Sequence, residues 1–272
     1  MELKYLKGIG PKRADAFNEI GITSVEDFLN FIPRVYLKRI SIKDVSAYKG
    51  ENVIIYGKII DVNIPVKRHH PVKVYLNDGT GSVSIPVFGA AEFRSKQFKP
   101  LDTYIFWGKV DEGWNAGKYQ ASFNYRDHLK VDMKDESDSD LLKYTLLPIY
   151  ELSGVLKKTW IKPLLLTKIV FNAFYSLVQR DSPSLAETLP KEVIEKNNYP
   201  SRKEAVIRIN FPKKVTYIEK SRKLLAFEEL FYLELLLAIG SHNFKNEKKG
   251  ISFNKSESDL VKNFESLLPF EL

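Results

Sequence analysis

Aromatic and basic side chains are interleaved in the middle of this 272-residue chain, between Val53 and Val131. Bases of a nucleic acid stack on aromatic rings, at about 1–3 kcal/mol per base, while lysine and arginine follow the phosphate backbone. Phe88 and Phe93 are the strongest candidates for exposed rings, because they flank Gly89-Ala90-Ala91 where an apolar run ends. The candidate nucleic-acid contacts are Phe88, Phe93, Lys67, Arg68, His69, His70, Arg94, Lys96, Trp114 and Lys118.

Catalytic chemistry finds little support in the same residues. The adjacent His69 and His70 fit phosphate contacts better than metal ligands, because no His, Asp or Glu at a suitable spacing would complete a metal site. No phosphate-binding loop of the form G-x-x-x-x-G-K-S/T occurs. The absence of cysteine excludes disulfides and thiol nucleophiles. We therefore expect this chain to carry no catalytic residues, no cofactor and no metal.

A second candidate site lies near the N-terminus, where Gly8-Ile9-Gly10 precedes Pro11, Lys12 and Arg13. This element resembles the hairpin of helix-hairpin-helix modules, in which glycine lets the backbone approach a phosphate and N–H groups at a helix start bind it. The alternative is a plain helical turn in which glycine only satisfies a left-handed backbone position. The candidate phosphate contacts are Gly8, Gly10, Lys12 and Arg13.

The charge balance favours an anionic partner. Lysine and arginine exceed aspartate and glutamate by 42 to 34, which gives a formal charge of +8 and a pI near 9.3. The most apolar segment, Leu224 to Ile239, is interrupted by glutamates, so we expect no membrane span. No secretion signal is visible at the N-terminus, and with the absence of cysteine this predicts a cytoplasmic protein. We also expect a monomer.

Residues 50–131 have the element order of an OB-fold, a small, partly open, five-stranded β-barrel. Two apolar runs precede the Asp78-Gly79 turn, which is a strong hairpin signal. A third run, a short helix and a second hairpin that turns at Trp114 to Gly117 follow. Gly57 and Gly108 lie in mid-strand and predict bulges or bends. The sequence predicts an α+β protein in which helices flank this barrel.

The remaining residues divide into four segments. We expect a helical hairpin at 1–49, an acidic, solvated linker at 132–146, an α-helical region at 147–243 and a further linker at 244–272. The α-helical region is predicted to begin at its first residues and to contain one long helix from about Tyr217 to His242, which has an apolar stripe. The apolar end of the sequence predicts that it belongs to a longer chain.

Together these segments resemble the N-terminal portion of the RecG family of bacterial ATP-dependent DNA helicases. The order of the segments is the specific signal, because the hairpin and the D-G-T-G turn also occur in other repair proteins and in anticodon-binding domains of tRNA synthetases. The matching stretches are Leu6 to Tyr36, Val74 to Phe88, Leu147 to Leu165, Ile209 to Lys214 and Ser221 to Ile239.

The resemblance implies that the barrel is a wedge domain, which splits the strands of stalled replication forks and Holliday junctions while a motor pulls the duplex. Phe88 occupies the position of a rim aromatic that stacks on unpaired bases, and Phe93 lies in the following loop, where a second aromatic can occur. ATP, Mg²⁺ and helicase activity would belong to the C-terminal motor domains of the parent protein. Branched or single-stranded DNA, those motor domains and a single-strand binding protein are the implied partners.

Two departures from the family pattern bear on this expectation. Phe123-Asn124-Tyr125-Arg126 replaces a His/Asn-Pro-Glu-Tyr run, which leaves the geometry of the last strand open, and Leu37-Lys38 replaces more acidic residues. Two other functions also stay open. One is an OB-fold interaction module that binds a partner peptide, such as the tail of a single-strand binding protein. The other is an RNA-binding OB-fold protein, in which the long helical region would have no role.

Overall fold

The chain divides into two compact units, Met1–Phe227 and Glu228–Leu272. The architecture mixes helices with two β-sheets, as the sequence predicts. The finer boundaries expected from composition stay predictions. The computed structural model describes residues 2–65, 70–89, 91–111, 123–247 and 259–270.

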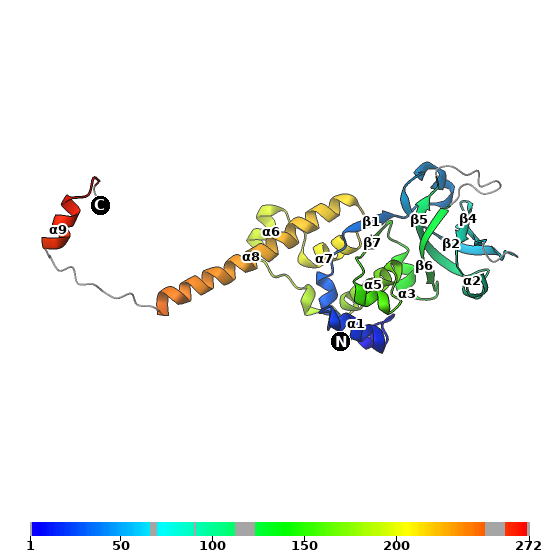
Figure 1. Ribbon diagram of the computed structural model, residues 1–272, viewed down its shortest axis with the longest axis horizontal. Coiled ribbons are helices and arrows are strands. Elements are labelled where there is room, and N and C mark those ends of the chain that lie inside the picture. Colours follow the sequence, from blue (N-terminus) through cyan, green and yellow to red (C-terminus); the bar gives the residue numbers. More distant parts are fainter. Residues whose placement is uncertain (1, 66–69, 90, 112–122, 248–258, 271–272) are drawn as a thin grey trace. The chain divides into compact units, whose positions relative to one another are not determined.

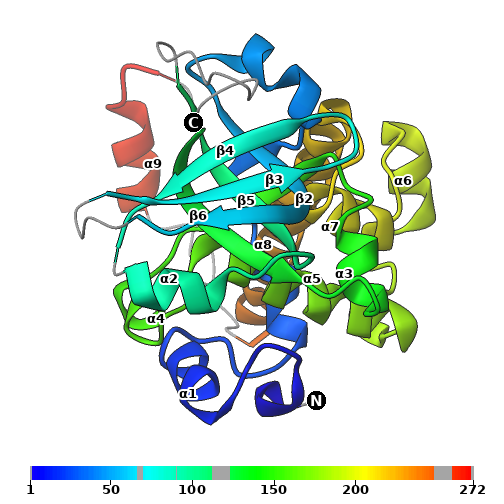
Figure 2. The same ribbon diagram turned by 90° about the vertical axis from the view of Figure 1, so that its right-hand side faces the viewer.

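Five strands of the first unit form one antiparallel sheet with the order β4-β3-β2-β5-β6 (Figure 1). The sheet is curved, and α2 (Ala91–Gln97) joins β4 to β5 beside it (Figure 2). The predicted order of strands around one short helix is therefore confirmed, and with it the OB-type, partly open barrel. The strands are β2 (Asn52–Asn63), β3 (Val72–Asn77), β4 (Ser82–Val87), β5 (Thr103–Val110) and β6 (Phe123–Val131).

The interior of the barrel is filled by apolar side chains, which alternate with less buried residues along β3 and β4, whereas β2, β5 and β6 contain consecutive buried residues. In β4, buried and partly exposed residues alternate without a break, which is the period-2 pattern of a strand with one core face. The register of β5 and β6 shifts between Trp107 and Gly108, where a bulge was predicted. Fully buried members of this core include Ile55, Leu76, Ile85, Phe106 and Phe123.

A second core lies beside the barrel and is built from the helices of the first unit (Figure 1). Its central element is α5, which begins with Pro163 at a first helical position, where the missing N–H is not needed. This helix is α5 (Pro163–Gln179), and the helices that share its core are η1 (Leu3–Tyr5), α1 (Pro11–Glu19), η2 (Glu26–Asn30), α3 (Glu136–Leu141), α4 (Gly154–Lys158), η4 (Pro183–Leu185) and α7 (Arg202–Asn210). The 3-10 helix η3 (Ile42–Tyr48) packs on the barrel core instead, and α6 (Lys191–Asn197) has no buried residue.

Two short strands contradict the expectation that helix begins at 147. β1 (Val35–Lys38) and β7 (Leu146–Ile149) pair antiparallel, with Leu37 opposite Leu147. The β7 sequence is short and shows no period of its own, so its partner, more than 100 residues away, decides its conformation. Arg39 also forms a bridge with Ile54 of β2, and this bridge joins the small ribbon to the barrel.

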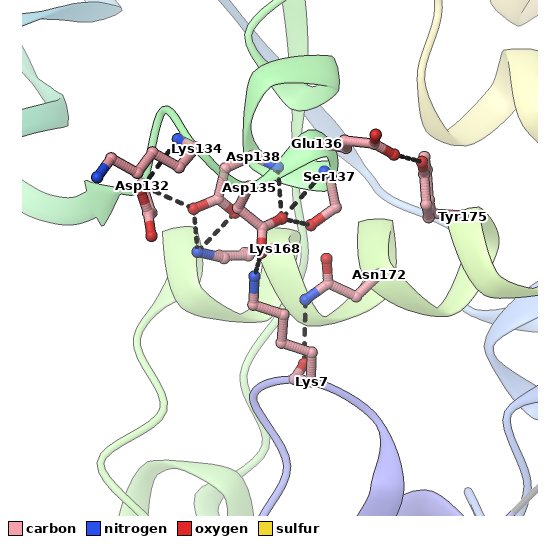
Figure 3. A network of polar contacts seen from close by, with 10 residues as sticks. All are labelled: Lys7, Asp132, Lys134, Asp135, Glu136, Ser137, Asp138, Lys168, Asn172 and Tyr175. Carbon is pink, nitrogen blue, oxygen red and sulfur yellow. Dashed lines mark hydrogen bonds and ion pairs between the residues drawn. The ribbon is translucent and has the colours of Figure 1, made fainter.

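The acidic segment after β6 is packed against α5, so the prediction of a solvated linker is wrong there (Figure 3). Asp135 caps the N-terminus of α3 by accepting the N–H of Ser137 at 3.0 Å. Asp138 is only 2% exposed, and its carboxylate lies 2.7 Å from Nζ of Lys168 on α5. Composition could not reveal this outcome, because the lysine that balances Asp138 lies 30 residues further along the chain.

The predicted long helix is confirmed as α8 (Val215–Glu247). Its first part belongs to the first unit and buries Leu224. In the second unit, Leu230, Leu233, Leu236 and Leu237 of α8 are exposed, and α9 (Asp259–Ser266) follows. Among the described helices, none is long and apolar enough to cross a membrane.

Candidate nucleic-acid interface

Phe88 and Phe93 both project from the barrel rim, at the point where β4 ends and α2 begins. Their side chains are 66% and 64% exposed. Val87 is fully buried at the end of β4, so the alternation of the strand directs Phe88 outward. Phe98, just after α2, fills the barrel core instead. Covering large apolar rings that lie in water is favourable, which makes this rim a candidate binding surface.

Gly89 brings a positive charge close to these rings. It has a φ of +128°, and a Cβ at this position would lie 3.2 Å from Nε of Arg94. The guanidinium of Arg94 therefore lies against the Gly89 backbone, and its central carbon is 5.9 Å from the ring centroid of Phe93. Two exposed rings beside a guanidinium match the way in which single-stranded nucleic acids are held, by base stacking and by contacts to phosphate.

A chain of hydrogen bonds fixes α2 to the barrel behind this surface. Nη1 of Arg94 donates to Oε1 of Gln97 at 2.9 Å, and Nε2 of Gln97 lies 2.6 Å from Nε2 of His128 on β6. Nδ1 of His128 lies 2.6 Å from the hydroxyl of Tyr125. These contacts hold the helix that carries Phe93 in one place. The sequence did not predict this series of hydrogen bonds, because its only sequence signal was a histidine within a predicted strand.

His128 is neutral in this setting. Burial lowers its pKa to about 3, and the charges of Lys162 and Arg94 act in the same direction. The amide of Gln97 is a donor at Nε2, so we assign Nε2 of His128 as the acceptor and its Nδ1–H as the donor to Tyr125. Burial raises the pKa of Tyr125 to about 12, so it remains a phenol. The link between α2 and β6 therefore keeps the same protonation state throughout the physiological pH range.

The other predicted contacts divide into two groups. His70 and Lys96 are exposed, and His70 lies two residues before Val72, which pairs with Val87. His70 is thus at the same end of the sheet as Phe88, and its contact with DNA stays a prediction. The remaining candidates, which lie outside the described residues, are Lys67, Arg68, His69, Trp114 and Lys118.

The N-terminal hairpin is fixed on α5. Gly8 has a φ of +95°, and a Cβ there would lie 3.0 Å from Cγ1 of Ile169. Its carbonyl accepts a hydrogen bond from Nη1 of Arg13 at 2.8 Å. The neighbouring Lys7 forms an ion pair with Asp135, and its carbonyl accepts Nδ2 of Asn172 at 3.0 Å (Figure 3). The glycine and the arginine both serve internal contacts in this structure.

Of the four candidate phosphate contacts, Gly8, Gly10 and Lys12 are exposed and Arg13 is half-buried. Gly10 directly precedes α1, and nothing lies within 4 Å of a Cβ placed on it. A phosphate contact at these four residues stays a prediction. The second helix of the hairpin is the 3-10 helix η2, and the carboxylate of Asp27 within it accepts the N–H groups of Thr23 and Ser24 in the preceding turn at 2.8 Å each.

Comparison with known proteins decides the family. The RecG wedge domain model matches residues 2–171. The chain belongs to the RecG wedge domain family. ATP-dependent DNA helicase RecG of Thermotoga maritima is 30% identical over 100% of this chain, and that of Synechocystis sp. is 24% identical over 93% of it. The chain covers 33% and 30% of these two RecG proteins, so it spans about a third of their length.

A solved structure described as RecG bound to a three-way DNA junction is similar over 100% of the chain, with 29% identity and a TM-score of 0.60. The chain covers 35% of that protein. The resemblance to RecG seen in the sequence is thereby confirmed, and the barrel with its flanking helices is the RecG wedge region.

Proposed function

We propose that this chain is the DNA-binding wedge region of a RecG-type helicase. It recognises branched DNA, such as stalled replication forks and Holliday junctions. It splits the strands while motor domains outside this sequence translocate on duplex DNA with ATP and Mg²⁺. The observation that carries the proposal is the pair of outward-facing rings, Phe88 and Phe93, at the barrel rim.

The rings would cap the branch point by stacking on the first unpaired bases, each worth about 1–3 kcal/mol. Arg94 beside the Phe93 ring and the exposed His70 and Lys96 would contact phosphates next to those bases. Because the sequence has no phosphate-binding loop for ATP, the wedge would separate strands only when a motor moves the DNA past it.

Affinity for a synthetic three-way junction and for a plain duplex, measured across a salt series, tests this function. We expect the junction to bind more tightly, and Phe88→Ala to weaken junction binding roughly 5- to 100-fold. Met133→Ala, which removes an exposed apolar side chain far from the rim in sequence, is the matched control and should have no effect. Equal, weak binding to junction and duplex would overturn the proposal.

We also propose that the motor domains contact the second half of α8. Leu230, Leu233 and Leu237 lie at helical spacing and are exposed, and leucines in such a row usually cover another surface. In the full-length helicase, Leu233→Ser combined with Leu237→Ser should uncouple ATP hydrolysis from unwinding. Unwinding at the wild-type rate would argue against this contact.

A second candidate function, peptide binding, is favoured by a pocket of about 330 Å³ in the helical part of the first unit. Tyr144, Phe171 and Phe211 line it together with Lys143 and Lys213, so it could accept an apolar side chain of an acidic peptide. The tail of a single-strand binding protein would be the candidate peptide. Competition between such a peptide and junction DNA would show whether the two ligands share a surface.

A further inference from the structure

Trp160 combines two unfavourable features in one residue. It lies in the turn between α4 and α5, has a φ of +59° and is 86% exposed. A bulky residue in the left-handed region is strained by about 1–2 kcal/mol, and an exposed indole gains nothing from the core. Packing therefore does not explain the tryptophan, and such outliers cluster at binding sites.

The indole forms one wall of a pocket of about 230 Å³. Gln97 of α2 and His128 of β6 line the buried side of this pocket, and Lys130 and Lys162 line its exposed side. Figure 2 shows α2 and α4 near the same corner of the first unit, and the shared pocket places the α4–α5 turn next to α2. The pocket thus offers one aromatic wall, polar groups at depth and positive charge at its opening.

Among the described residues, two lysines and no acidic residue line the pocket, and each of these lysines has a carboxylate partner outside the lining. Nζ of Lys130 lies 2.7 Å from Oδ2 of Asp102, and Nζ of Lys162 lies 3.8 Å from Oδ1 of the buried Asp127. That carboxylate is also held by the N–H of Leu164 at 2.9 Å. Two more exposed lysines, at 157 and 158, end α4, and neither makes an ion pair among the residues that the structure describes.

Gln97 connects this pocket with the rim. Its Oε1 accepts from Arg94, which lies over the Phe93 ring, while the same side chain lines the pocket of Trp160. At 1.5 Å per residue, the helix from Phe93 to Gln97 rises about 6 Å. A single strand of DNA is long enough to contact both places at once.

We propose that Trp160 is a second base-stacking site, which takes an unpaired base of the single strand that leaves the barrel rim. Lys130 and Lys162 contact the phosphates on either side of that base. The inference rests on the proposed function and extends the DNA-binding surface from α2 to the α4–α5 turn.

Three substitutions of the same residue separate stacking from folding. With a dT oligonucleotide and a three-way junction that carries one single-stranded arm, Trp160→Ala should weaken binding roughly 5- to 100-fold. Trp160→Phe keeps an aromatic face and should stay within about 3-fold of the wild type. Trp160→Gly removes the ring but relieves the left-handed backbone, so it should lose affinity while its melting temperature stays equal or rises.

Fluorescence supplies an independent signal. The chain contains three tryptophans, and Trp107 is only partly exposed in β5. Trp114 is itself a predicted DNA contact, so the variant to use is Trp107→Phe combined with Trp114→Phe, which keeps Trp160 as its single tryptophan. If a base stacks on Trp160, the dT oligonucleotide should quench the emission of this variant.

Each outcome decides between the two proposals. If Trp160→Ala and Trp160→Gly bind like the wild type while Phe88→Ala does not, the second site is wrong and the wedge function stands. Lost affinity accompanied by a lower melting temperature in both variants would make Trp160 a structural residue and would overturn the site. A wild-type chain that binds neither probe would overturn both proposals.

Discussion

The N-terminal hairpin and the barrel rim carry the same kind of sequence signal, a glycine close to basic residues, yet the two glycines face different surroundings. Gly8 and Gly89 both have a positive φ. The backbone of Gly8 is approached by Ile169 of α5, and that of Gly89 by the guanidinium of Arg94. A left-handed glycine therefore shows that something comes close to the backbone, but only the fold shows whether it is a core side chain or a charged group.

The hairpin and the rim also differ in whether their side chains bond within the protein or face water. Around the hairpin, Lys7 pairs with Asp135 through its ammonium group and accepts a hydrogen bond from Asn172 at its carbonyl, so these interactions contribute to stability. At the rim, Phe88 and Phe93 remain in water, so their interaction energy is available to a ligand. The hairpin thus belongs to the part of the first unit whose polar groups bond internally, which we call the framework. The rim is the exposed surface that this framework supports.

The largest effect is expected where the framework contains a buried ion pair. Lys168→Met would leave the carboxylate of Asp138 without its lysine in a site that is 2% exposed. We expect the free energy of unfolding to fall by about 3–5 kcal/mol, as measured by urea denaturation. Lys168→Met together with Asp138→Leu removes both charges and should recover most of that loss. A single variant as stable as the wild type would show that the pair contributes nothing.

Substitution of Gly8 tests whether the N-terminal hairpin stabilises the fold. Gly8→Ala forces an L-residue into φ +95° and places its Cβ 3.0 Å from Ile169, so it should destabilise the chain by about 1–3 kcal/mol. Gly10→Ala is the matched control, because it has open space and a φ of −99°, and it should have little effect. Equal melting temperatures for the two variants would contradict the assignment of Gly8 to the framework.

The buried His128 behind the rim should make the free energy of unfolding depend on pH. The folded His128 has a pKa of about 3, whereas unfolded histidine has about 6.5. Between these values the unfolded chain binds a proton that the folded chain does not. Stability should therefore fall as the pH drops below about 6.5, by up to about 1.4 kcal/mol per pH unit. The neighbouring Asp127 acts in the opposite sense at lower pH, because burial raises its pKa despite hydrogen bonds from Leu164 and His128.

His128→Gln keeps a hydrogen-bonding side chain next to Gln97 and Tyr125 but removes the titration. Urea denaturation at pH 7, 6 and 5 should show a slope that is smaller by about 1.4 kcal/mol per pH unit than that of the wild type. An unchanged slope would mean that another group causes the acid sensitivity.

The sequence predicted the barrel well because its signals are local. The Asp78-Gly79 turn and the alternating runs need no information from distant residues. It failed where a distant partner decides the outcome, as for β7, which pairs with β1, and for Asp138, which pairs with Lys168. The same limit applies to the site. The exposed Phe88 could be chosen from its position at the end of a strand, whereas Trp160 stood in a helical, apolar pattern and only the fold shows that it is exposed.

The smallest effect on stability is expected at the rim itself, and it completes the contrast with the framework. Because the ring of Phe88 is 66% exposed, Phe88→Ala should change the free energy of unfolding by no more than about 0.5 kcal/mol. Phe98→Ala, close by in the chain but only 1% exposed, should cost about 3–5 kcal/mol. Urea denaturation of the two variants measures both values. If Phe88→Ala lowers stability as much as Phe98→Ala does, the ring belongs to the core, and its effect on DNA binding would be a consequence of misfolding.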